Sequence, residues 1–85
     1  MYLHIGGNQM IDVRCLVTMF KAHPKKTGKS NPLQQYHQKF IRIDKVEDKK
    51  IRSYVVTEDA IYATPISLET IVNRYRQLFT TDYGG

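Results

Sequence analysis

The feature that most constrains the fold is the way turn-forming residues divide the chain into short apolar runs. The opening run MYLHI stops at Gly6-Gly7-Asn8, and the runs QMIDV and RCLVTMF follow directly. Glycine permits positive φ, so this cluster can reverse the chain. Runs this short, rich in Val, Ile, Leu and Phe, suit strands better than helices. Residues 1–20 therefore predict a β-hairpin followed by a third strand.

Two further runs, FIRIDKV and IRSYVVT, flank a polar break at Glu47-Asp48. A polar break between two runs rich in β-branched and aromatic residues is typical of a hairpin. The two runs therefore predict a second hairpin. The run AIYATPI, which follows a turn at Glu58-Asp59, predicts one more strand.

A short helix is expected to begin at Asn31-Pro32. Asparagine is a favourable N-cap, and proline fits the first helical position, where its missing N–H costs nothing. Leu33, Tyr36 and Phe40 then follow at spacings of three and four, which places them on one helical face. The segment predicts one short amphipathic helix.

A second and longer helix is expected to begin at Ser67, with Glu69 favourably placed in its first turn. Its apolar residues share one face: Leu68, Ile71, Val72, Tyr75, Leu78 and Phe79. The predicted order is β-β-β-α-β-β-β-α. This is a small single α+β domain over residues 1–79, with short antiparallel or mixed strands and two helices, followed by a disordered tail at 80–85.

The charge is concentrated in the middle of the chain. The 85 residues contain 13 Lys and Arg against 8 Asp and Glu, a formal net charge of +5. Between Lys21 and Arg52 there are ten cations and three acids, net +7, whereas the remainder has three cations and five acids, net −2. Such a balance favours an anionic partner such as nucleic acid or a membrane surface. A domain this small also has little stability to spare, so oligomerisation would help it.

Cysteine and histidine residues give no support to a metal site or to catalysis. Cys15 is the single cysteine, which excludes an internal disulfide, and His4, His23 and His37 are scattered without metal-ligand spacing. No arrangement of Ser, His and Asp or of paired carboxylates can be argued. We therefore expect no enzymatic activity, no cofactor and no small-molecule substrate.

The N-terminal segment MYLHIGGNQM lacks the cationic and apolar regions of a signal peptide. No run approaches the roughly 18 apolar residues that a membrane helix needs. A cytoplasmic protein without membrane attachment is expected.

The segment HPKKTGKS imitates a phosphate-binding P-loop, since it ends in Gly-Lys-Ser between an expected strand and an expected helix. His23 stands where the motif requires its first glycine, so we interpret Lys25, Lys26 and Lys29 as a solvated basic loop that can touch phosphate backbone. The chain ends in Gly-Gly, as ubiquitin-like sulfur carriers do. The ending TTDYGG shares only this dipeptide with them.

The segment VEDKKIRSYVV carries the most informative cations. In the expected hairpin, Lys49, Lys50 and Arg52 lie at the tip, where they could enter or straddle a DNA groove. Strand alternation places Ile51 and Ser53 on one face and Arg52 on the other. An alternative reading is that these cations protect a strand edge against aggregation, which is a common use of lysine.

Blocks of the sequence resemble a known family of small bacterial regulators of extracellular matrix genes, the RemA/RemB family, and more closely its RemB (YaaB) type. The matching blocks are MYLHIGG, IDVRCLVTMF and RSYVVTEDAIYATPISLETIVNR. The resemblance covers residues 1–79, and 21–40 match least.

The resemblance implies a DNA-binding transcriptional regulator of biofilm matrix genes, with a fold similar to LytTR-type DNA-binding domains. It also implies that protomers assemble into a ring whose rim DNA can contact. The DNA-contacting arginines of the family match Arg14 here and, before the VV strand, the positions of Lys49, Lys50 and Arg52.

The leading hypothesis is an oligomeric regulator that binds double-stranded DNA through the phosphate backbone. Arg14, Lys49, Lys50 and Arg52 would hold the phosphates, helped by Lys25, Lys26 and Lys29. Subunit contacts would involve Tyr2, Leu3, Ile5, Tyr62 and the apolar face of the last helix. The alternative is a non-enzymatic assembly module that partners a related regulator and binds DNA weakly or not at all.

Overall fold

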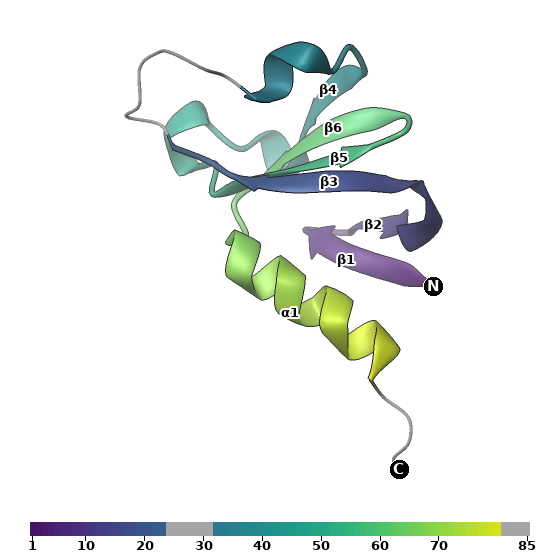
Figure 1. Cartoon of the computed structure of the whole chain (residues 1–85). Helices are drawn as coiled ribbons and strands as arrows, with labels where there is room; N and C mark the ends of the chain where they lie inside the picture. Colours follow the sequence, from purple (N-terminus) through teal and green to yellow (C-terminus); the bar gives the residue numbers. More distant parts are fainter. Residues whose placement is uncertain (24–31, 81–85) are drawn as a thin grey trace.

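The computed structural model describes residues 1–23 and 32–80 (Figure 1). The elements are β1 (Tyr2–Gly6), β2 (Gln9–Asp12), β3 (Leu16–Lys21), β4 (Lys39–Arg42), β5 (Ser53–Thr57), β6 (Ala60–Thr64) and α1 (Leu68–Phe79). The described residues also include the short 3-10 helices η1 (Val13–Cys15), η2 (Pro32–Gln35), η3 (Ile43–Lys45) and η4 (Asp48–Lys50). The α+β class is confirmed, but the described residues contain one α-helix instead of two.

The first hairpin is confirmed. β1 and β2 pair antiparallel, with Leu3 opposite Ile11, and the chain reverses at two glycines whose φ angles are 135° at Gly6 and 53° at Gly7. A Cβ atom on Gly6 would lie 2.7 Å from the hydroxyl oxygen of Thr64. Glycine is therefore required at position 6 both for its backbone conformation and for its close packing.

The other four strands form one mixed sheet in the order β3-β5-β6-β4. β5 pairs antiparallel with both β3 and β6, whereas β4 pairs parallel with β6. The predicted hairpin between β4 and β5 is therefore wrong. The turn after Thr57 joins β5 to β6, and the Thr57 hydroxyl stabilises it by accepting from the N–H groups of Asp59 and Ala60. With β3 on its other edge, β5 has no edge left for β4.

The predicted helix after Asn31 is reduced to the single 3-10 turn η2. The amide of Tyr36 donates to the carbonyl of Leu33, and Phe40 lies in β4, opposite Ile61 of β6. A helix of about ten residues is marginal without extensive packing, so the pairing of β4 with the edge of β6 outweighs it. Tyr36 still packs against the sheet, since its ring lies 6.2 Å from that of Phe20 on β3.

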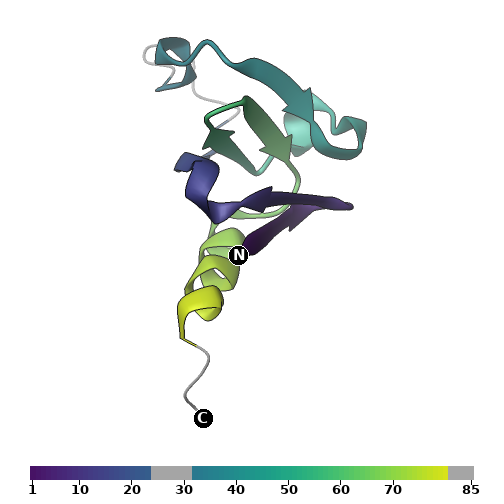
Figure 2. The same cartoon turned by 90° about the vertical axis from the view of Figure 1, so that its right-hand side faces the viewer.

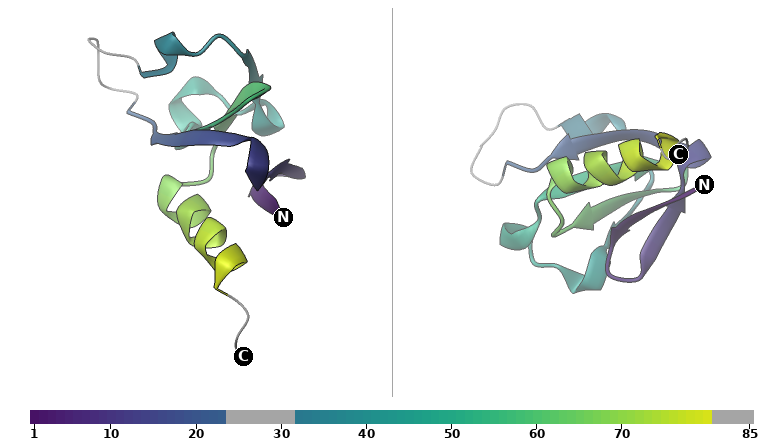
Figure 3. Two further views of the ribbon diagram at one scale, coloured as in Figure 1. Left: turned by 45° about the vertical axis from the view of Figure 1, so that its right-hand side comes forward. Right: turned by 90° about the horizontal axis from the view of Figure 1, so that it is seen from below.

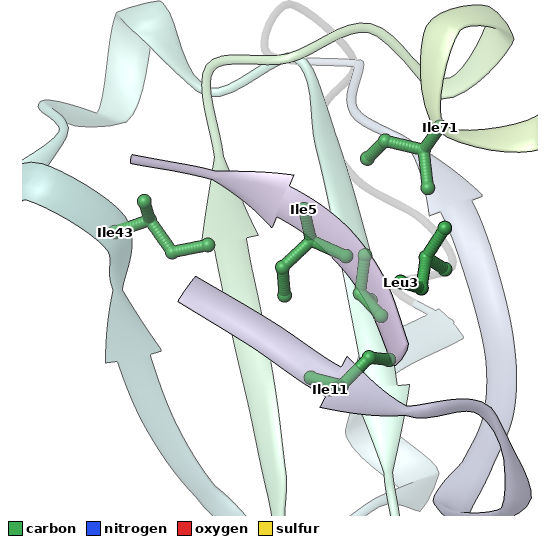
Figure 4. Close-up of a cluster of buried hydrophobic side chains, with 6 residues drawn as sticks. Leu3, Ile5, Ile11, Ile43 and Ile71 are labelled. Atoms are coloured by element: carbon green, nitrogen blue, oxygen red, sulfur yellow. The ribbon is translucent and has the colours of Figure 1, made fainter. Parts of the chain in front are cut away.

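The core lies between one face of the four-stranded sheet and a second layer formed by the hairpin and α1 (Figures 2 and 3). Its buried members come from the hairpin, η3, β5 and α1: Leu3, Ile5, Ile11, Ile43, Val55 and Ile71 (Figure 4). Leu3 and Ile5 are 1% and 0% exposed, and Tyr62 packs against the same cluster. Leu3 and Ile5 therefore stabilise the protomer and cannot line a subunit contact, contrary to expectation.

The long helix begins as predicted. The Ser67 side chain accepts a hydrogen bond from the amide of Thr70 and caps α1, and Ile71 is buried against the hairpin. Arg74 fixes the helix to β1 by donating to the backbone carbonyl of His4 at 3.2 Å. Thr80 is the C-cap, and the rest of the predicted tail, residues 81–85, lies outside the described residues. In the part of the chain that is described, no helix is long and apolar enough to cross a membrane.

Candidate nucleic-acid interface

The sheet has two ends that differ in charge, and β3 connects them. At one end β3 finishes at Lys21, which is opposite Ser53 at the start of β5, and β4 finishes at Arg42. We call this the basic end, and its cations are Lys21, Arg42, Lys45, Lys49, Lys50 and Arg52. The opposite end holds the turn between β5 and β6 and also η1, whose Cys15 carbonyl accepts from the amide of Glu58.

Lys49 and Lys50 lie in η4, within the connection that crosses from β4 to β5, and not at a hairpin tip. The turn forms because the Lys50 amide donates to the carbonyl of Glu47 at 2.8 Å. Val46 and Ile51, on either side of the turn, are buried at 7% and 4% exposure and pack with Ala63. The two lysines are exposed on a short turn that is anchored at both ends.

Arg52 has the predicted alternation. Its neighbours Ile51 and Ser53 are buried, while its own side chain is exposed. Its backbone lies between two strands, since its amide donates to the Thr64 carbonyl at 2.9 Å and its carbonyl accepts from Ala22 at 3.0 Å. Arg52 is therefore a charged side chain on a fixed backbone at the basic end.

Arg42 is a member of the basic end that sequence reasoning did not select. Its guanidinium donates to the Val46 carbonyl at 3.0 Å and forms an ion pair with Asp48 at 2.7 Å. It also lies over the ring of Phe40, 5.4 Å from the centroid. The sequence signal is the two-residue spacing between Phe40 and Arg42, which places both on one face of a strand.

Arg14 lies at the other end of the sheet, in η1, separated from η4 by the length of β3 (Figure 1). Six strand residues span about 20 Å, which is more than a Debye length of about 8 Å at physiological salt. Arg14 also has an acidic partner, because its guanidinium lies 2.8 Å from the carboxylate of Asp12. Hydrogen bonds from the Arg14 side chain and backbone lower the pKa of Asp12 to about 2. One protomer does not bring Arg14 together with Lys49, Lys50 and Arg52.

Lys25, Lys26 and Lys29 lie outside the described residues, so their predicted contacts remain predictions. The described residue Ala22, which precedes this loop, packs with Val46 and Ile51 at the basic end.

The charge balance of the two ends has opposite signs. Among the described residues, the six cations of the basic end are all exposed and are accompanied by the three acids Asp44, Glu47 and Asp48, net +3. The described residues of the opposite end include two cations, Arg14 and Lys39, and three acids, Asp12, Glu58 and Asp59, net −1. Within residues 1–23 and 32–80, no group of three or more His, Cys, Asp or Glu side chains is placed to hold a metal ion. The basic end is thus the best candidate for binding a polyanion.

Comparison of the chain with protein-family models and with curated proteins finds no match.

Proposed function

We propose that this chain is a non-enzymatic, oligomeric regulator of transcription that binds double-stranded DNA through its basic end. The observation that carries the proposal is the gathering of six exposed cations, net +3 with their acidic neighbours, at one end of the sheet. The resemblance to the RemA/RemB family adds regulation of extracellular matrix genes, assembly into a ring and a LytTR-like fold to the proposal.

The geometry favours contacts with phosphates. Lys49, Lys50 and Arg52 are within four residues of one another and start from a backbone held by hydrogen bonds and by buried Val46 and Ile51. Lysine ammonium groups act as point charges on phosphates and do not offer the planar fork with which arginine recognises guanine. Such contacts position a protein on DNA without specifying sequence.

Arg14 enters this proposal through the oligomer. Because it lies about 20 Å from the basic end of its own protomer, its simplest role is to contact DNA beside the basic end of a neighbouring subunit. Its ion pair with Asp12 fixes the guanidinium while leaving the side chain 82% exposed. Exposed ion pairs of this kind contribute little to stability in water, so Arg14 can exchange Asp12 for a phosphate at small cost.

A second candidate function is an assembly module with weak or no DNA binding. The observation that favours it is a set of large apolar side chains exposed on the hairpin and on α1, namely Met1, Tyr2, Met10 and Phe79. Such side chains can form subunit contacts in a regulator as well. The two functions therefore differ only in what the basic end does.

The test compares two double variants that remove the same charge. Lys49→Ala/Lys50→Ala changes the basic end, and Lys39→Ala/Arg76→Ala removes two exposed cations elsewhere. Fluorescence anisotropy on a mixed-sequence duplex should give a salt slope that is less steep by about 1.8 for each protomer that contacts the duplex. One such protomer alone would make the binding of the first variant roughly 30-fold weaker at about 0.15 M salt. The second variant should bind like the parent. If both folded variants bind like the parent, the assembly module replaces the DNA-binding regulator.

A further inference from the structure

The face of the sheet that is turned away from the hairpin carries a group of aromatic rings. Val55 and Tyr62 pack into the core beneath the sheet, so Tyr54 and Ala63, their neighbours in sequence, project from the other face. The pairing of β4 with β6 places Phe40 and Arg42 on this face as well, with Arg42 opposite Ala63. Phe40, Arg42 and Tyr54 therefore come together across three strands.

The three side chains make direct contacts. The rings of Phe40 and Tyr54 lie 6.3 Å apart with an interplanar angle of 50°. The Arg42 guanidinium lies 5.4 Å from the Phe40 centroid and is itself held by the Val46 carbonyl and by Asp48. Phe40 nevertheless remains 46% exposed. The ring is thus held in place by its neighbours while much of its surface is open to solvent.

The surroundings of this group are cationic. The ion pair between Arg42 and Asp48 joins β4 to η4, and Lys49 and Lys50 directly follow Asp48. Arg52, which directly precedes β5, is two residues from Tyr54 and is exposed. An exposed ring beside a planar guanidinium and several cations suits a ligand that alternates flat rings with negative charges.

We propose that Phe40, Tyr54 and Arg42 form a stacking platform for unpaired nucleobases, and that Lys49, Lys50 and Arg52 hold the phosphates of the same single strand. Proteins that bind single strands combine aromatic rings with a basic groove in this way. The phosphate contacts rest on the proposed function, because they use the same basic end. The platform goes beyond the proposed function, because paired bases in a duplex are stacked on one another and cannot cover Phe40.

The geometry favours stacking over insertion of Phe40 as a wedge between base pairs. A wedge must project from the surface, whereas the Phe40 ring lies against Tyr54 and beneath Arg42 on the sheet. A tyrosine hydroxyl is protonated at neutral pH, so Tyr54 can also donate a hydrogen bond to a base.

The test uses the full chain and two matched variants. Phe40→Leu keeps an apolar side chain on β4 and removes the ring, and Val17→Ala shortens an apolar side chain of similar exposure, 49%, on β3. Binding of a labelled oligothymidine, which forms no duplex, should weaken by about 5- to 150-fold in Phe40→Leu and should not change in Val17→Ala. Binding of a mixed-sequence duplex should be the same in both. Oligothymidine binding by folded Phe40→Leu equal to that of the parent would overturn the platform.

Two further measurements keep the failures distinguishable. Arg42→Lys keeps the charge and removes the planar guanidinium, so it should weaken oligothymidine binding even where Phe40→Leu proves unstable by circular dichroism. A change in light-scattering mass in Phe40→Leu, with oligothymidine binding retained, would assign Phe40 to a subunit contact and overturn the proposal.

If the parent binds oligothymidine through Phe40 but does not bind duplex, the platform stands and the proposed duplex binding fails. If the parent binds duplex through Lys49 and Lys50 but does not bind oligothymidine, the platform alone fails.

Discussion

The two ends of the four-stranded sheet differ in how their cations are balanced. At the opposite end Arg14 is paired with Asp12, and Glu58 and Asp59 are close by. At the basic end Arg42 is paired with Asp48, whereas Lys49, Lys50 and Arg52 have no ion pair within the described part of the chain. A net positive charge alone therefore does not identify a binding surface, because some of the cations are paired with acidic side chains in the folded protein.

The largest effect on stability is expected at Gly6, which packs against Thr64 at the end of β6. Gly6→Ala would place a methyl group against the Thr64 hydroxyl, which is buried and donates to the Ile5 carbonyl at 2.7 Å. Strain at a positive φ and the disturbed buried hydrogen bond should together lower the free energy of unfolding by about 2–5 kcal/mol. Urea denaturation followed by circular dichroism measures this change.

Gly7→Ala is the matched control for that change. A methyl group there would meet the carboxylate of Asp44, which is exposed and can move away. Gly7→Ala should therefore lower the free energy of unfolding by only about 1 kcal/mol, because the left-handed backbone conformation is the sole source of strain. Equal destabilisation by the two variants would contradict the role given to Gly6 packing.

A smaller effect is expected at the opposite end. Arg14→Ala should weaken duplex binding by about 5-fold at about 0.15 M salt, the value of one phosphate contact, without changing the oligomer mass. Anisotropy titration and light scattering on the same sample measure the two quantities. Unchanged duplex binding in this variant would remove the opposite end from the interface and leave the basic end alone.

The smallest effect concerns the pH dependence of stability. The pKa of Asp12 is lowered from 3.8 to about 2 by Arg14, so the folded state favours the ionised carboxylate. Its contribution to stability is fully present above about pH 4 and is lost as the pH falls toward 2. In Arg14→Ala the backbone N–H of residue 14 still donates to Asp12, so by NMR the Asp12 pKa should rise above 2 and stay below 3.8. A titration midpoint that stays near 2 would show that the Arg14 side chain does not lower this pKa.

Much of the fold could be predicted from local pattern. The turn at Gly6-Gly7, the alternation around Arg52 and the cap at Ser67 each depend on a few neighbouring residues, and the structure contains all three. The partner of β4 depends instead on which sheet edge is free once β5 and β6 have paired. The break at Glu47-Asp48 has the composition of a hairpin turn, although it belongs to a crossover. The spacing of Leu33, Tyr36 and Phe40 suits a helix, yet Phe40 also fits a strand.

From the sequence alone, the candidate site could be recognised only by its neighbouring cations. Lys49, Lys50 and Arg52 are adjacent in sequence, so their proximity needed no fold. The separation of Arg14 from them depends on the direction of β3, and the meeting of Phe40, Arg42 and Tyr54 depends on the strand order β5-β6-β4. Contacts between residues distant in sequence carry no local signal, which is why these two features could not be predicted.

Lysine footprinting on the unmodified protein tests most directly whether double-stranded DNA binds at the basic end, because both ends of the sheet are compared in one sample. An amine-reactive ester labels exposed lysines, and mass spectrometry compares labelling with and without a saturating mixed-sequence duplex. The duplex should protect Lys45, Lys49 and Lys50 at the basic end. It should leave Lys39 as reactive as before, because Lys39 lies on β4, the edge strand farthest from β3 and Arg14. Equal protection of Lys39 and Lys49, or no protection of either while the duplex is bound, would contradict binding at the basic end.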